Sequence, residues 1–148
     1  MRRLILLAAL GLAALGLAAC GKAEAPMPPA PPADAVIDVR RPMDASGLDP
    51  AWALKIRGLQ FTLDRPSEPQ IVATAPGAVI QPGKVSWTAA TGDGRTLKVN
   101  LYSSACSDGT SEARYSYSAE VILPDGSLLA GCAALAGPKA RAQVQAKR

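Results

Sequence analysis

Residues 85–101, VSWTAATGDGRTLKVNL, decide the fold class because apolar and polar side chains alternate along most of this stretch. A period of two is typical of β-strands, and the Gly-Asp-Gly at 92–94 predicts a three-residue loop between two of them. The resulting hairpin pairs Trp87 with Val99 on one face. Gly94 can adopt the left-handed conformation that such a loop needs.

A second hairpin is predicted in residues 52–63 from the same alternation. A two-residue turn at Arg57-Gly58 pairs Ile56 with Leu59. One face of this hairpin then collects the apolar side chains, which are Trp52, Leu54, Ile56, Leu59, Phe61 and Leu63.

A third hairpin is predicted to turn at Asp125-Gly126 and to pair Ala119 with Cys132. This register directs the Cys132 side chain toward the core. Cys106 does not share the parity of the apolar residues in 97–101. It is therefore expected past the end of that strand or beyond a bulge, where the chain bends toward Cys132.

Shorter strands are predicted at 70–75 and 78–81, around a Pro-Gly turn. Tyr115 and Tyr117 fall in phase with the apolar residues of the third hairpin and are expected to face the core. The chain is thus expected to be all-β, a small antiparallel barrel or sandwich of about seven or eight short strands. This β domain is assigned to residues 47–137.

The segments that flank the domain differ from it in composition. Residues 20–46 form a linker rich in Pro and Ala, with five prolines between positions 26 and 32, which predicts an extended and semi-rigid stalk. Residues 138–148 carry four basic side chains and are expected to form a solvated basic tail. Contact of this tail with anionic lipid is the alternative.

Residues 1–19 have the parts of a bacterial lipoprotein signal peptide. Two arginines supply the charged start, and the run at 4–17 is apolar without a charge. The lipobox Leu17-Ala-Ala-Cys20 closes the segment, with small residues before the bond that a peptidase would cleave. Cys20 is then expected to carry acyl chains that anchor the protein to a membrane. A plain secretory signal that happens to end in Cys is the alternative.

Location and charge restrict the expected partners. Gly21 favours the outer membrane, with the protein on its periplasmic face, because an Asp at this place would indicate retention of a lipoprotein in the inner membrane. Without residues 1–19 the chain has 14 basic and 12 acidic side chains, so nothing in its charge predicts binding to nucleic acid.

The two remaining cysteines, Cys106 and Cys132, are expected to form a disulfide because the compartment beyond the inner membrane is oxidising. The chain has no histidine and no C-x-x-C motif, which removes the support for a metal pair or for a catalytic triad. No catalytic residue, metal site or cofactor is therefore predicted. A carboxylate pair among Asp108, Glu112 and Glu120 is the remaining alternative for catalysis.

The polar stretch at 107–114 is the best candidate for a contact surface. It lies beside Cys106 and combines Asp108, Glu112 and Arg114 without an obvious demand from packing. A hydrogen-bonded loop that serves the fold alone is the competing interpretation.

The cysteine region carries a family resemblance. The segment 106–112, CSDGTSE, is followed by Tyr115, Tyr117, Ala119 and Val121, and then by 129–133, LAGCA. This pattern resembles C-S-D-G-M-S-D, Y-P-x-x-A-x-V and L-x-G-C-A in a family of uncharacterised bacterial envelope lipoproteins, and GLDPAW at 47–52 resembles its entry motif G-x-E-P-x-W. The similarity covers about residues 47–133, with departures at Thr110, Glu112 and Ser116. The resemblance implies the fold and the disulfide rather than an activity.

The sequence therefore leads to the hypothesis of a non-enzymatic lipoprotein, anchored in the outer membrane, that binds or supports another envelope protein or a cell-wall component. One alternative is a lysozyme-inhibitor-like protein, with the loop from Cys106 to Arg114 plugging an enzyme cleft. A hydrolase is the second alternative, and the missing histidine disfavours it.

Overall fold

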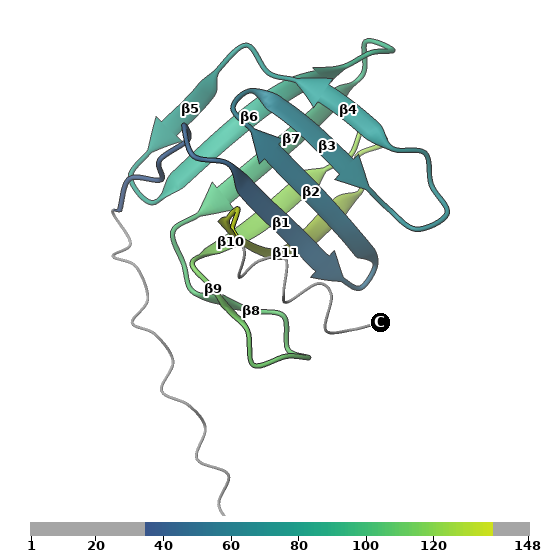
Figure 1. The fold of residues 1–148 in the computed structure, drawn as a ribbon. Helices are drawn as coiled ribbons and strands as arrows, with labels where there is room; N and C mark the ends of the chain where they lie inside the picture. Colours follow the sequence, from purple (N-terminus) through teal and green to yellow (C-terminus); the bar gives the residue numbers. More distant parts are fainter. Residues whose placement is uncertain (1–34, 138–148) are drawn as a thin grey trace, which may run out of the picture.

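The computed structural model describes residues 35–137, and these residues form strands joined by loops and turns (Figure 1). The expected all-β class is confirmed. The strands are β1 (Met43–Leu48), β2 (Ala51–Arg57), β3 (Gln60–Asp64), β4 (Ile71–Thr74), β5 (Ala78–Gln81), β6 (Lys84–Thr91), β7 (Thr96–Tyr102), β8 (Cys106–Ser107), β9 (Arg114–Tyr115), β10 (Tyr117–Ile122) and β11 (Leu128–Leu135).

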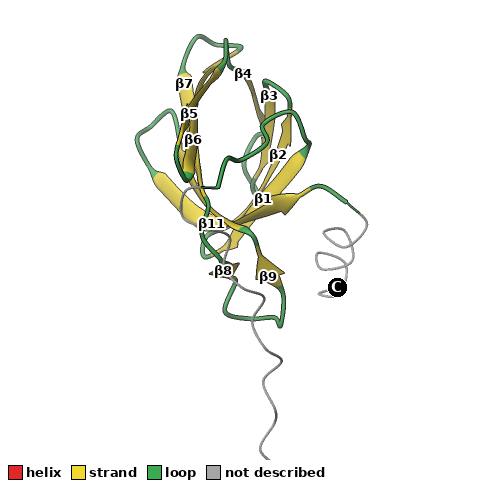
Figure 2. Cartoon of the chain, turned by 90° about the vertical axis from the view of Figure 1, so that its left-hand side faces the viewer, coloured by secondary structure: helices red, strands yellow, loops and turns green. Residues whose placement is uncertain are grey.

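Eight of these strands close into an antiparallel barrel, which decides between the barrel and the sandwich left open by the sequence. The order around the barrel is β1-β2-β3-β4-β6-β7-β10-β11, and β11 pairs with β1 to complete the ring. β5 is an additional strand that pairs with β6 beyond the end of β4. β8 and β9 form a small separate hairpin that projects beside the barrel (Figure 2).

The barrel is filled by the inward-facing side chains of its strands, as the alternating pattern predicted. In β2 and β7, for example, every second residue is buried and the residues between them are exposed or half-buried. Phe61 and Trp87 meet edge to face in this core, with ring centroids 5.6 Å apart. Ile37, from the segment before β1, belongs to the same buried cluster.

The hairpin predicted at 85–101 is confirmed in register and in loop. Trp87 pairs with Val99, and the loop at 92–94 joins β6 to β7. Gly94 has a φ of 78°, the left-handed conformation that the loop requires. Thr91 hydrogen bonds to Asp93, and the Arg95 Nε donates to the same carboxylate at 2.7 Å. These contacts hold the pKa of Asp93 at about 2, with the Thr91 hydroxyl as the largest cause.

The register predicted for the hairpin at 52–63 is wrong by two residues. Ile56 pairs with Phe61, and Leu59 lies in the turn with its side chain partly exposed. Gly58 has a φ of 62° and takes the first of the two turn positions, which a type II′ turn reserves for glycine. A shift of two residues keeps the parity of the strand, so the other predicted core residues are still buried.

The register predicted for the third hairpin is wrong by one residue. Ala119 pairs with Gly131, and Cys132 pairs with Ser118. The loop contains three residues, 124–126, and Gly126 stands third in it with a φ of 88°, as Gly94 does in its own loop. Because a shift of one residue exchanges the two faces of a strand, Cys132 points to the outside of the barrel.

The predicted boundary of the linker is also wrong. Residues 43–46 belong to β1, which lies between β2 and β11, and Ile37 is already part of the core. The polar side chains of Asp44 and Ser46 alternate with the buried Met43 and Ala45, so β1 has the same period of two as the strands predicted after it. The signal peptide, the linker up to residue 34 and the basic tail lie outside the described residues.

The indole of Trp52 packs against the backbones of two neighbouring strands, β1 and β11. Its Nε1 donates to the Ala130 carbonyl at 3.3 Å. A Cβ added to Gly47 would stand 2.2 Å from this nitrogen, and a Cβ added to Gly131 would stand 2.1 Å from the Ser46 carbonyl oxygen. Glycine at both positions therefore leaves the room that the indole and the adjacent backbone occupy.

We predict that Gly131→Ala lowers the free energy of unfolding by about 2 to 3 kcal/mol, because the added methyl group must push the β1 backbone away from β11. Urea titration followed by tryptophan fluorescence measures the change. Gly77→Ala is the matched control, since no atom lies within 4 Å of its added Cβ. It should change the same free energy by no more than about 1 kcal/mol. Equal effects of the two substitutions would contradict this explanation.

Candidate functional site

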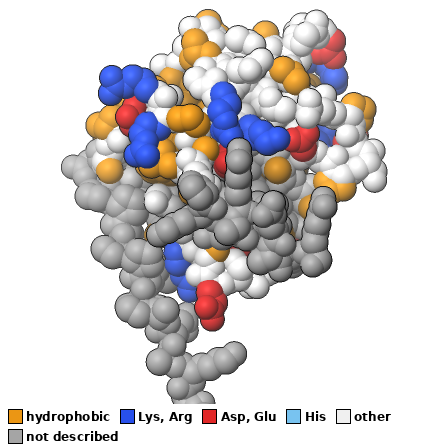
Figure 3. All heavy atoms as spheres, viewed as in Figure 1, with side chains coloured by type: hydrophobic (Ala, Val, Ile, Leu, Met, Phe, Trp, Pro, Cys, Tyr) orange, Lys and Arg blue, Asp and Glu red, His pale blue; other side chains and the backbone are white. Residues whose placement is uncertain are grey.

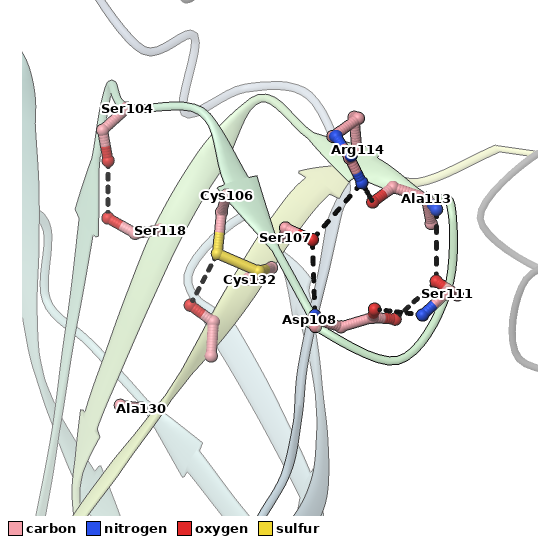
Figure 4. Close-up of a disulfide and its surroundings, with 12 residues drawn as sticks. Ser104, Cys106, Ser107, Asp108, Ser111, Ala113, Arg114, Ser118, Ala130 and Cys132 are labelled. Atoms are coloured by element: carbon pink, nitrogen blue, oxygen red, sulfur yellow. Dashed lines mark hydrogen bonds between the residues drawn. A yellow bond between two sulfur atoms is a disulfide. The ribbon is translucent and has the colours of Figure 1, made fainter. Parts of the chain in front are cut away.

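Residues 103–116 leave the barrel at the end of β7 and fold back over its outer wall; we call them the flap. β8 and β9 pair within the flap, and both contact β11. Cys106 in the flap and Cys132 on β11 form a disulfide, with their Cα atoms 5.5 Å apart (Figure 4). The expected bridge and the expected bend of the chain past β7 are confirmed. The prediction that the Cys132 side chain points toward the core is wrong.

The bridge fastens the flap to the outside of the barrel. Cys132 is only 3% exposed although it faces outward, because the flap covers it. The Cys106 Sγ lies 3.5 Å from the Gly131 carbonyl oxygen. Nearer the start of the flap, the hydroxyls of Ser104 and Ser118 lie 2.8 Å apart and form a hydrogen bond to β10. The flap is thus held at two separate points of the outer wall.

Asp108 shapes the tip of the flap. Its carboxylate accepts hydrogen bonds from the backbone amides of Thr110 and Ser111, at 3.0 and 2.8 Å, and from the Ser111 hydroxyl at 2.7 Å. Gly109 follows with a φ of 71°. This is the hydrogen-bonding pattern by which Asp organises a turn. The tip therefore has a defined shape without a helix or a long strand.

A groove of about 610 Å³ lies between the flap and the barrel wall. Binding sites for small ligands typically have volumes in this range. The lining residues come from the flap, from the adjoining ends of β1 and β2, and from the end of β3 with the loop that follows. They are Ser46, Gly47, Leu48, Ala51, Trp52, Ala53, Asp64, Arg65, Pro66, Asp108, Thr110, Ser111 and Tyr115.

The floor of the groove is apolar because of which side chains β1 and β2 present outward. Ser46 pairs with Ala53, and Leu48 pairs with Ala51. Three of these four side chains are small, so they leave space under the flap. Leu48, Ala51 and Ala53 are exposed to solvent. An apolar surface with room above it is available to a ligand.

Polar groups stand on both sides of this floor. On the flap side, Tyr115 has a pKa raised above its usual value, first by burial and then by the nearby Asp108 carboxylate. On the opposite side, an Arg65 guanidinium nitrogen lies 3.8 Å from Glu68. Asp64 accepts a hydrogen bond from Gln70 at 2.6 Å. A ligand in the groove would therefore meet the Tyr115 hydroxyl and the Asp108 carboxylate on one side, and the Arg65 guanidinium and the Asp64 carboxylate on the other.

The structure brings only part of the predicted contact surface into the groove. Asp108 lines it, whereas Glu112 and Arg114 do not. Arg114 turns back along the flap, where its guanidinium donates to the Ser107 hydroxyl and the Ala113 carbonyl, each at 3.3 Å. The Glu112 side chain is exposed. Cys20, the expected site of lipidation, lies outside the described residues.

The two tyrosines expected in the core take different positions. Tyr117 packs against the core as predicted, but Tyr115 lines the groove. Ser116 separates Tyr115, at the end of β9, from Tyr117, at the start of β10, so a single parity does not apply to both. Arg65, which follows β3, also lines the groove, and no local motif in the sequence predicts this role.

The alternative of a carboxylate pair gains nothing from the structure. Glu120 does not line the groove; it accepts hydrogen bonds from the Tyr102 hydroxyl at 2.7 Å and from the Asn100 amide at 3.4 Å. Within residues 35–137, no three His, Cys, Asp or Glu side chains are placed to hold a metal ion. The same part of the chain contains no helix that is long and apolar enough to cross a membrane.

Comparison of the chain with protein-family models, curated proteins and solved structures gives no match. The groove is therefore interpreted from its own geometry.

We predict that Asp108→Asn lowers the pKa of Tyr115 toward the usual tyrosine value. The substitution removes the negative charge that opposes ionisation of the hydroxyl, while burial continues to raise the pKa. A titration of tyrosinate absorbance, taken as the difference between variant and wild type, measures the shift. Glu112→Gln removes one negative charge from the same loop and should leave the curve unchanged. The same shift in both variants would show that Asp108 does not act on Tyr115 specifically.

Proposed function

We propose that this chain is a non-enzymatic, lipid-anchored protein of the bacterial envelope that binds an apolar segment of another envelope component between its flap and its barrel. The observation that carries the binding role is the groove under the flap, with its apolar floor and polar sides. The anchor and the outer-membrane location are supported by the lipobox that ends at Cys20 and by Gly21 after it.

The groove suits an extended polypeptide segment better than a compact polar ligand. Its floor is made of mostly short side chains on two paired strands. Leu48 pairs with Ala51, and Ser46 pairs with Ala53 on the same outer face. Contact with these side chains would remove apolar surface from water, which favours binding. The polar groups at the sides would fix the orientation of the segment, as in other binding sites with few polar contacts.

The residues that carry the resemblance to envelope lipoproteins are also those that hold the barrel wall and the flap in the positions that form the groove. Gly47, Trp52 and Gly131 form the contact between β1, β2 and β11, and Cys106 and Cys132 hold the flap. Their roles support the proposal that the chain belongs with that group of uncharacterised proteins. The catalytic alternative has no comparable support among the described residues, since Asp108 organises the flap and Glu120 lies outside the groove.

We predict that a photoreactive residue placed at position 51, in the groove, cross-links one envelope component in living cells. Ala53→Trp should reduce the yield of this adduct at least about tenfold, because an indole on the floor would fill the space that the partner needs. Thr88→Trp is the matched control: Thr88 is exposed on the outer face of β6, away from the groove lining, and its replacement should leave the yield unchanged. Mass spectrometry of the adduct identifies the partner.

The binding role would be contradicted if Ala53→Trp left the adduct unchanged while both variants kept the melting temperature of the wild type. A cell-wall hydrolase as the cross-linked partner would favour the inhibitor alternative over a supporting role. The anchor is tested separately, by the mass of the N-terminal peptide, which should carry acyl chains on Cys20.

A further inference from the structure

Apolar side chains are exposed at the barrel end where the chain enters the domain. The segment 35–42 begins near β5 and crosses this end of the barrel toward β1 (Figures 1 and 2). Val36 is 75% exposed in this segment, and Val79 and Ile80 on β5 are 63% and 51% exposed. These three are among the most exposed large apolar side chains in residues 35–137.

β5 also presents an open strand edge. It pairs with β6 through residues 78–81, and no other strand pairing of β5 exists in the described part of the chain. An open edge that carries valine and isoleucine is a place where soluble proteins normally put charge or a covering element. Residues 78–81 carry no charged side chain, and no other strand of residues 35–137 covers this edge.

Basic side chains lie next to this apolar edge. Arg40 is 90% exposed and forms only a surface ion pair with Asp38, at 3.2 Å. Arg41 is exposed as well, and Lys84 begins β6 directly beside β5. Figure 3 shows blue and orange side chains mixed at the upper left, with a red side chain between the blue ones. Exposed valine and isoleucine beside arginine match a phospholipid surface, which offers an apolar interior under anionic phosphates.

The position of the proposed lipid anchor in the chain indicates that this phospholipid surface is the membrane that carries the protein. The described structure begins at residue 35, and 14 residues, 21–34, separate it from Cys20. A lipid on Cys20 would therefore hold residue 35 within about 50 Å of the bilayer, the greatest span of 14 residues, so the tether allows this end of the barrel to reach the membrane. β1 leads away from it, from Met43 to Leu48, and Leu48 lines the groove.

We propose that this end of the barrel rests on an anionic phospholipid bilayer, with Val36 and the open edge of β5 in the interface and Arg40 and Arg41 on the phosphates. Val79 and Ile80 point to opposite faces of β5, and both enter the interface at this edge. The inference rests on the proposed lipid anchor for its orientation. It adds that the membrane holds the domain in one pose, in which the groove beside Leu48 is directed to the periplasm. A partner could then bind without competing with the bilayer.

Hydrogen exchange of the tethered protein tests this contact without depending on lipidation. Residues 21–148 are attached to vesicles through an N-terminal His tag and a nickel-chelating lipid, in place of the acyl chains. On vesicles containing phosphatidylglycerol, amides in 36–41 and 78–81 should exchange at least about fivefold more slowly than in the same protein free in solution, since even one Arg at an anionic surface contributes about that factor. Amides at 92–94 and 124–126, at the other end of the barrel, should not change.

Three variants separate the contributions. Val79→Ser with Ile80→Ser, and Arg40→Gln with Arg41→Gln, should each remove most of the protection on the vesicles. Leu128→Ser, which removes an exposed leucine at the other end of the barrel, should keep it. All three should retain the slow exchange of β7 that reports an intact barrel.

Exchange in 36–41 and 78–81 that does not change on anionic vesicles would overturn the proposal. Protection that appears without vesicles and grows with protein concentration would overturn it as well, because it would place a second copy of the chain on the β5 edge. The mass of the N-terminal peptide tests the anchor in a different measurement. A missing acyl chain would therefore refute the proposed anchor without deciding whether this surface binds lipid.

Discussion

The contact between the Trp52 indole and the glycines of two neighbouring strands is the interaction on which the rest of the structure depends. Gly47 and Gly131 have no side chains, so the backbones of β1 and β11 can lie against the ring and against each other. The pairing of β11 with β1 closes the barrel. A larger side chain at either glycine would move β11, and the outer wall that carries the flap would move with it.

Two consecutive residues of β11 connect this contact to the groove. Gly131 faces inward and makes room for Trp52, and Cys132 faces outward and binds the flap through Cys106. The disulfide therefore does not cross-link the core; it fastens an external segment to a wall whose position the core determines. Because the flap tip is shaped by Asp108, the groove is bounded by two preformed surfaces and needs no large rearrangement to accept a segment.

The sequence predicts the elements of this fold better than their registers. The register predicted for the hairpin at 85–101 is correct because its Gly-Asp-Gly loop allows one good alignment. In the hairpin at 52–63, Gly58 can occupy either position of a two-residue turn, so two registers fit the sequence. In the third hairpin, the predicted two-residue turn at Asp125-Gly126 left out Pro124, which belongs to a three-residue loop. The disulfide was predictable from the cysteine count together with the oxidising compartment that the signal peptide leads us to expect. The groove was not, because Ala53 and Tyr115 are far apart in the chain and meet only after the barrel has closed.

The disulfide holds the flap over the outer face of β1 and β2. Carbon-resolved NMR spectra of the alanine methyl groups, recorded before and after reduction of the bridge, test this role most directly. We expect the signals of Ala51 and Ala53 to move when the Tyr115 ring leaves the groove, while those of the interior Ala89 and Ala119 stay in place. Unchanged Ala51 and Ala53 signals, or equal shifts at all four residues, would contradict it.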